Sequence, residues 1–167
     1  MNNDLTGKFS NVYIMLLYAI MTNDIERVKH FLSDEMYLKY KNIIDEHIRN
    51  NETEMFDELN VYRIDIESSE IKDNFEYVTV KIISRYMDYF IDNDTKKKKR
   101  GIDSYRIEKT NILVFKRSVS FNYEKNIHTC ENCGANLDIN FSGVCPYCNQ
   151  STDLKYKEYI LIDLKTL

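Results

Sequence analysis

The fold prediction depends most on the stretch FEYVTVKIISRYMDYFI, residues 75–91. It lies in a region, beginning near residue 58, where apolar residues recur with a period of two, as in a half-buried β-strand. The stretch is longer than most strands and is apolar on both faces in its second half. A strand of this length has to bend, and we expect a β-bulge at the doubled pair Ile82 and Ile83.

Three further strands are predicted around it, at residues 62–66, 104–116 and 157–167. In the first two, apolar residues alternate with polar ones. The alternating residues are Tyr62, Ile64 and Ile66 in one strand and Tyr105, Ile107, Leu113 and Phe115 in the other.

The first 50 residues have helical periodicity instead. An apolar face with spacings of three and four predicts a helix that ends near residue 21. Asn23 with Glu26 has the spacing of a capping box, so we expect a short second helix, and Ser33 is the expected N-cap of a third. Helices followed by strands indicate an α+β protein with its helices packed on one face of an antiparallel sheet. The residues of the first apolar face are Phe9, Val12, Tyr13, Leu16, Leu17, Ile20 and Met21.

All four cysteines lie in CENCGANLDINFSGVCPYCN, residues 130–149. Two Cys-x-x-Cys pairs at this separation favour zinc held by four thiolates over two disulfides or four unligated thiols. Gly134 and Asn149 follow the pairs, where left-handed backbone is commonly required. Four thiolates leave no position for a catalytic water, so we expect one structural Zn²⁺ and take His128 as an exposed loop residue. The predicted ligands are Cys130, Cys133, Cys145 and Cys148.

The cysteine segment lies between the last two predicted strands, so we expect an insertion into a hairpin of the sheet rather than a separate tail. The expected division has three parts: an N-terminal tail, a main domain and an inserted zinc ribbon. Their residues are 1–7 for the tail, 8–127 plus 155–167 for the main domain and 128–154 for the ribbon.

Charge is distributed unevenly. The first 95 residues hold 10 Lys and Arg against 19 Asp and Glu, whereas the rest hold 13 against 8. Only the second part could attract nucleic acid or an anionic membrane. The ribbon has no Lys or Arg between Cys130 and Asn149, and its thiolates add negative charge. Nucleic-acid binding is therefore the weaker interpretation.

The apolar run VYIMLLYAIM, residues 12–21, is too short to cross a bilayer core, and no signal-peptide cleavage site follows it. Cysteine spacing that favours metal over disulfides indicates a reducing compartment. We therefore expect a cytoplasmic protein.

A basic run, TKKKKRG at 95–101, is expected at a hairpin tip. One interpretation is weak contact with anionic lipid head groups, at about 1 kcal/mol per basic residue. The other is a solvated turn whose charge is reduced by Asp92, Asp94 and Asp103. The membrane-surface candidates are Lys96, Lys97, Lys98, Lys99 and Arg100.

Catalysis has little support in the sequence. Asp65 and Asp88 lie in predicted strands, where a buried carboxylate could act as a general base and an outward-facing one could not. The sequence shows no Ser-His-Asp arrangement, phosphate-binding glycine loop or second metal cluster. We expect a protein that is not an enzyme.

The order of three segments resembles the Tim44-like domain family, named for subunit 44 of the mitochondrial inner-membrane translocase. These segments are MTNDIERVKHFLSDEMYLKY (21–40), YMDYFID (86–92) and the cysteine segment. Over about residues 8–167 the chain is similar to the bacterial version with a zinc ribbon before its last strand. The resemblance implies a strongly curved sheet of the nuclear transport factor 2 type, wrapped by helices into a cone with a pocket. It also implies a transport-related binding role at membranes.

Relatives often carry a transmembrane segment before this domain, whereas this chain starts almost directly with its first helix. We therefore expect any membrane attachment to be peripheral, at the inner face, or through a partner protein.

We predict a non-catalytic binding protein whose cone holds a lipid-like or peptide ligand, with the zinc ribbon as a structural and docking element. The alternative is a ribbon adaptor that binds a protein or nucleic-acid partner, with the main domain as scaffold. Thirteen tyrosines suit an apolar cavity wall that is not wholly dry, although such residues also form plain core. The predicted pocket residues are Tyr13, Leu17, Tyr37, Tyr40, Tyr77, Tyr86, Tyr89, Phe115 and Tyr159.

Overall fold

The computed structural model describes residues 2–152 and 154–167. Its helices are α1 (Asn2–Met21) and α2 (Asp34–Arg49), with short 3₁₀ turns at Ile25–Arg27, Lys29–Phe31 and Leu154–Lys157. Its strands are β1 (Glu52–Lys72), β2 (Phe75–Asp92), β3 (Lys98–Ser118), β4 (Phe121–Asn122), β5 (Ile127–Thr129), β6 (Asn136–Asp138) and β7 (Ile160–Thr166).

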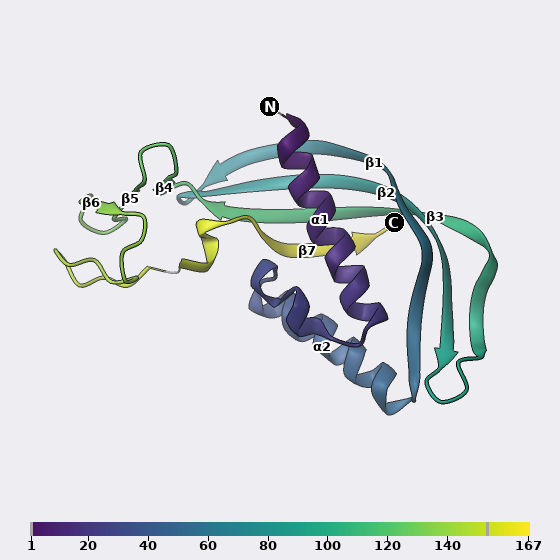
Figure 1. The fold of residues 1–167 in the computed structure, drawn as a ribbon. Helices are drawn as coiled ribbons and strands as arrows, with labels where there is room; N and C mark the ends of the chain where they lie inside the picture. Colours follow the sequence, from purple (N-terminus) through teal and green to yellow (C-terminus); the bar gives the residue numbers. More distant parts are fainter. Residues whose placement is uncertain (1, 153) are drawn as a thin grey trace.

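One antiparallel sheet contains the four main strands, in the order β1-β2-β3-β7. Helices α1 and α2 both pack on one face of this sheet (Figure 1). The predicted α+β class is therefore confirmed. The first strand is much longer than predicted, and a two-residue turn joins it to β2. Asp73 and Asn74 form that turn with φ of 51° and 64°, a left-handed conformation that Asn and Asp adopt more readily than most residues.

The predicted bulge at Ile82 and Ile83 is wrong. Both residues pair in regular register with β3, opposite Asn111 and Thr110. The irregularity nearest to them lies on β1 instead, where the register shifts between Val61 and Arg63. A strand can bend through an extra residue on its partner, so the doubled isoleucines do not locate the bulge.

A second irregularity separates the hairpin tip from the rest of the sheet. Tyr86 pairs with Ile107, but Asp88 already pairs with Ile102. Gly101 then lies opposite Tyr89, at φ +96°, so close that a Cβ there would be 2.5 Å from backbone atoms. The sheet is not strongly curled. The nuclear transport factor 2-like cone therefore stays a prediction.

The predicted apolar face of the first helix is confirmed, since six of its seven residues are buried and Met21 is partly buried. Helix α1 begins at Asn2, so most of the segment predicted as an N-terminal tail is helical. The helix predicted after Asn23 is a pair of 3₁₀ turns. Its cap is Asp24, whose carboxylate accepts the Glu26 N–H at 3.2 Å, because Asn23 itself is left-handed at φ 51°.

Ser33 caps α2 as predicted. Its hydroxyl oxygen accepts the N–H of Met36 at 3.2 Å. The N–H of Ser33 itself donates to the carbonyl of Leu161 on β7 at 3.0 Å. The start of α2 is therefore attached to the edge of the sheet.

The cysteine segment is inserted between β3 and β7, which pair with each other in the main sheet. It contains a small sheet of order β4-β5-β6 and extends from one end of the molecule (Figure 1). The small sheet already begins at Phe121, whereas the predicted ribbon began at 128. The division into three parts stays a prediction.

Candidate metal centre and cavities

The four cysteines converge at one point of the inserted segment. Their Sγ atoms all lie within 4.8 Å of one another, and two pairs, Cys130–Cys148 and Cys133–Cys145, are separated by 3.7 Å. A disulfide needs an S–S distance of about 2.05 Å. Thiolates bound to tetrahedral zinc at about 2.3 Å lie roughly 3.8 Å from one another. The four sulfurs are therefore compatible with a metal site such as zinc.

Both Cys-x-x-Cys turns have the same backbone arrangement. The N–H of Gly134 donates to the carbonyl of Cys130, and the N–H of Asn149 donates to that of Cys145, at 2.8 Å in each case. Gly134 has φ +74° and Asn149 has φ +60°, both in the left-handed region that the sequence predicted. Two equivalent knuckles therefore present their sulfurs to one centre.

Hydrogen bonds to two of the four sulfurs favour the thiolate form, which is the form that binds metal. Backbone N–H groups of Cys133 and Asn132 hold the pKa of Cys130 below its usual value. The Asn132 side chain and the Gln150 N–H lower the pKa of Cys148 to about 6. These donors support Cys130 and Cys148 as ligands of a cation, whereas burial and the other three cysteines raise the pKa of Cys133 to about 11.

His128 is not the exposed loop residue that the sequence predicted. Its side chain is fully buried, and its ring stacks between Phe121 and Phe141, with centroids 4.2 Å and 4.9 Å away. Neither ring nitrogen has a hydrogen-bond partner among the described residues. Burial lowers the pKa of His128. The residue therefore packs as an aromatic core member beside the cysteines rather than as a ligand.

Six of the nine predicted pocket residues line one of two cavities. Phe115 and Tyr159 line a cavity of about 320 Å³, which we call the apolar cavity. Tyr13, Leu17, Tyr40 and Tyr86 line a second one of about 200 Å³.

The apolar cavity lies against α1, with β3 and the segment that leads into β7 on its other side. Several residues of its wall do not follow from the sequence, because Phe9 and Val12 belong to the apolar face of α1 that is expected to pack in the core. The full wall is Lys8, Phe9, Asn11, Val12, Met15, Phe31, Phe115, Glu158 and Tyr159.

The other three predicted tyrosines line neither of these two cavities. The Tyr37 hydroxyl donates to Glu26 at 2.5 Å, and the Tyr89 hydroxyl donates to Asp57. The Lys116 ammonium lies 5.6 Å from the centroid of the Tyr77 ring.

The two strand carboxylates considered for catalysis have different environments. Asp65 is half-buried and is paired with Arg63 at 2.7 Å. Asp88 lines the cavity of about 200 Å³. Glu54 lines the same cavity and was not predicted as a site residue from the sequence.

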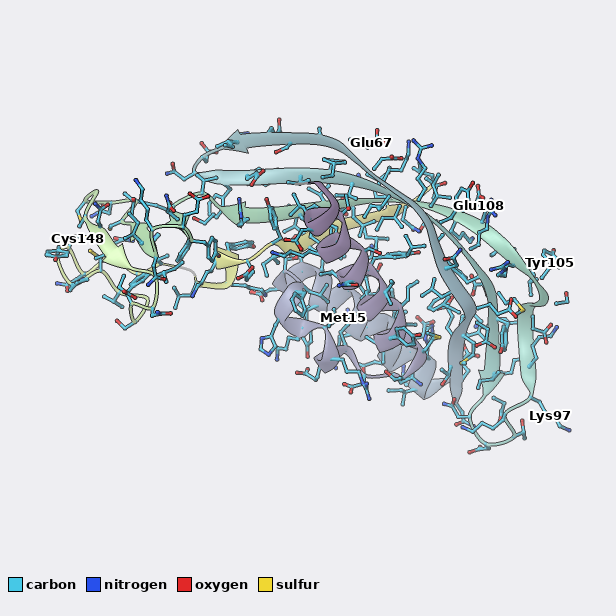
Figure 2. All side chains as sticks on the ribbon, turned by 45° about the horizontal axis from the view of Figure 1, so that its top comes forward. Met15, Glu67, Lys97, Tyr105, Glu108 and Cys148 are labelled. Carbon is cyan, nitrogen blue, oxygen red and sulfur yellow. The ribbon has the colours of Figure 1, made fainter. Side chains whose placement is uncertain are left out.

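The basic run lies at the β2–β3 tip, at the opposite end of the molecule from the cysteines, as the positions of Lys97 and Cys148 show (Figure 2). Much of its charge is paired. Lys98 lies 2.8 Å from Asp103, while Lys99 and Arg100 lie 3.0 and 2.7 Å from the Glu52 carboxylate. The membrane contact stays a prediction, because the structure does not test it.

Glu52→Gln should lower the free energy of unfolding by about 2–3 kcal/mol at neutral pH. The Glu52 side chain is only 3% exposed and accepts two Arg100 hydrogen bonds of 2.7 Å. Arg100 and Lys99 lower the pKa of Glu52 to about 2. The stabilisation is therefore complete above about pH 4.3, the ordinary glutamate pKa, and is lost as the pH falls from there towards 2.

Urea unfolding of both proteins across this pH range measures the effect. Glu67→Gln is the matched control, because Glu67 is 43% exposed and its pair with Lys81 should contribute less than about 1 kcal/mol. Equal destabilisation by the two substitutions would show that the Glu52 pair is no stronger than a surface pair.

Three comparisons place the chain among known proteins. A model of the Tim44-like domain matches residues 2–126. No curated protein sequence matches the chain. Among solved structures, the intermembrane space region of the chloroplast protein ARC6 is similar over 97% of this chain and 95% of that one, with 6% identity and a TM-score of 0.49.

In the part of the chain that the structure describes, none of the helices has both the length and the hydropathy of a membrane span. The family model covers both helices, the first three strands of the main sheet and the start of the inserted segment. With that coverage, well over half of its length, the chain belongs to the Tim44-like domain family.

Proposed function

We propose that this protein is a non-catalytic, transport-related binding protein that holds a lipid-like or apolar peptide ligand in the apolar cavity. The observation that carries the proposal is the cavity itself. Its volume of about 320 Å³ lies at the lower end of the range for ligand pockets, and most of its wall is aromatic or aliphatic. Membership of the Tim44-like family supports the transport-related part.

The polar groups of the cavity wall suit an amphiphilic ligand. Lys8 and Glu158 offer one charge of each sign, and Asn11 offers an amide. An apolar chain could lie against Phe9, Met15 and other apolar residues while its polar end meets these groups. In this proposal the helices and the sheet form a nuclear transport factor 2-like frame, and the cavity opens at its side.

In the same proposal the inserted segment is a zinc ribbon that stabilises its own fold and offers a docking surface. Zinc held by four cysteines would be structural, because no coordination position remains for substrate. Val144 and Tyr147 of the second knuckle are 45% and 73% exposed. They favour a second candidate function, in which the ribbon is an adaptor for a protein partner and the main domain is its scaffold.

Met15→Trp should weaken binding of a fluorescent fatty acid by at least about tenfold, because the larger ring fills the apolar cavity that Met15 lines. Figure 2 shows Met15 on α1. The measurement is a fluorescence titration of the full chain, with native mass spectrometry to identify any co-purified ligand.

The control is Leu38→Trp, which adds the same ring on α2 at a position that is 55% exposed. This control should bind as the unmodified protein does. Fatty-acid affinity that is the same in the Met15→Trp and Leu38→Trp proteins would contradict the apolar cavity as the binding site.

A further inference from the structure

A second cavity of about 200 Å³ lies between the helices and the sheet. We call it the acidic cavity, because Glu54 of β1 and Asp88 of β2 both line it. Phe56 pairs with Asp88 across the two strands, so Glu54, two residues earlier, lies on the same face and diagonally opposite Asp88. Burial and the neighbouring Asp88 carboxylate raise the pKa of Glu54.

The rest of the wall is mainly aromatic and aliphatic. Phe56 and Tyr86 are each 6% exposed, and their rings meet edge to face with centroids 5.1 Å apart. Leu16 of α1 and Leu164 of β7 also line the cavity. A hard metal ion requires six or more oxygen ligands, whereas ring faces and alkyl groups next to a carboxylate suit an organic cation.

A tyrosine hydroxyl in the wall supports the presence of a ligand. Tyr40 of α2 lines the cavity and is only 8% exposed, yet its hydroxyl makes no hydrogen bond with any described residue. The neighbouring Tyr13 hydroxyl, by contrast, bonds to Ser84 at 2.7 Å and to Asn111 at 3.1 Å. The Tyr40 oxygen remains accessible from the cavity, where it can accept a hydrogen bond from a ligand.

We propose that the acidic cavity binds a primary alkylammonium group, carried either by a free amine or by a lysine side chain of a peptide. An ammonium has three N–H donors, and Glu54, Asp88 and Tyr40 offer three acceptors. The alkyl chain would lie against Leu16, Leu164 and the rings. A cavity of about 150 Å³ holds benzene, so this one has room for a short alkyl chain.

Binding of the ammonium should displace a proton. Burial and the Asp88 carboxylate raise the pKa of Glu54 to about 8, so near neutral pH Glu54 keeps its proton. The positive ligand favours two ionised carboxylates, and Glu54 then releases its proton to solvent while the amine keeps all of its own. An alkylammonium stays protonated up to a pKa of about 10.4. Its affinity should therefore rise with pH, by up to about tenfold per unit, until about pH 8.

Other charged groups also surround the pair, and two of them are ammonium groups: Lys109 lines the cavity, and Lys39 lies 5.5 Å from the centroid of the Tyr40 ring. The Nε2 atom of His47 lies 3.9 Å from Glu54, and burial lowers the pKa of His47, which keeps it neutral. Further charged groups nearby are Arg100 and Glu52, which form their own ion pair, and Asp163 near Tyr40.

Isothermal titration of the full chain with n-pentylammonium chloride tests the proposal, with 1-pentanol as the uncharged ligand. We expect the ammonium to bind and the alcohol to bind at least about tenfold more weakly. Repeating the titration in buffers of different ionisation enthalpy should show proton release near pH 7 and less of it above about pH 8.

Variants then assign the site. Glu54→Gln and Asp88→Asn should each weaken pentylammonium binding by at least about tenfold, and Tyr40→Phe by about threefold or more. Asp65→Asn, which changes another carboxylate on β1, should leave it unchanged. Met15→Trp should also leave it unchanged, because Met15 lines the other cavity. Failure of the fatty-acid proposal is thereby distinguishable from failure of this one.

Nα-acetyl-lysine methylamide distinguishes the two sources of the group. Tighter binding than pentylammonium would favour a peptide lysine, and weaker binding would favour a free amine. Equal affinity for the ammonium and the alcohol, or the absence of binding at millimolar concentration, would overturn the proposal. Unchanged affinity in folded Glu54→Gln protein would do the same. If neither carboxylate variant folds, Tyr40→Phe and the pH profile of the unmodified protein still decide the question.

Discussion

If the four cysteines hold zinc as proposed, Cys130→Ser should abolish one-to-one zinc binding and unfold the inserted segment, while the two helices and the main sheet remain folded. The hydrophobic core around the cysteines is very small, and half of its members are cysteines themselves: Cys130, Leu137 and Cys145, with Ala135, Phe141 and Cys148 partly buried against them. Structural zinc contributes about 10–16 kcal/mol of binding free energy in small modules. The stacked rings of Phe121, His128 and Phe141 add apolar burial to this segment, but of only about a few kcal/mol.

The effect can be followed by native mass spectrometry for zinc stoichiometry and by amide NMR for the order of the inserted segment. Circular dichroism reports the helices separately. Ser142→Ala is the control, because Ser142 is an exposed residue of the same segment. A metal-free protein whose inserted segment keeps its dispersed amide resonances would show that the cysteines need no metal.

Phe115→Ala should lower the free energy of unfolding of the main domain by about 3–5 kcal/mol. Phe115 on β3 is fully buried, and its ring stacks on Phe9 of α1 with centroids 4.3 Å apart. Tyr159 meets the same Phe9 ring edge to face at 5.1 Å. Removing the Phe115 ring leaves a hole between helix and sheet that these neighbours fill only in part.

Urea unfolding followed by circular dichroism measures this loss. Phe115→Leu keeps an apolar side chain and should cost less than half as much, whereas Tyr105→Ala, on the same strand but 59% exposed, should change stability by less than about 0.5 kcal/mol. A Phe115→Ala protein as stable as the Tyr105→Ala protein would contradict the packing of α1 on the sheet through this residue.

Features that depend on neighbours in the chain were predictable from the sequence. The apolar stripe of α1 follows from a spacing of three and four residues, the Ser33 cap follows from one side chain, and the cysteine knuckles follow from two short turns. Each of these features is a local geometry, so a short stretch of sequence is sufficient to predict it.

Predictions failed where a local signal competed with tertiary contacts. Asn23 has the spacing of a cap, but its side-chain amide donates to Thr53 at 2.8 Å and leaves the capping role to Asp24. His128 is polar, but its ring stacks between two phenylalanines that only the folded inserted segment brings to it. In both cases the partner lies on another element. The spacing of residues along the chain therefore does not predict the contact.

The two cavities illustrate the same division. The composition predicted tyrosine-rich walls, but the register of β1 on β2 and the crossing of α1 and α2 assign each tyrosine to a cavity, to a hydrogen bond or to the surface. Glu54 and Asp88 lie 34 positions apart in the sequence and become neighbours only because their strands pair in this register. A spacing of a few residues determines helices, caps and metal knuckles, whereas contacts between distant residues form only when the whole sheet and its helices pack together.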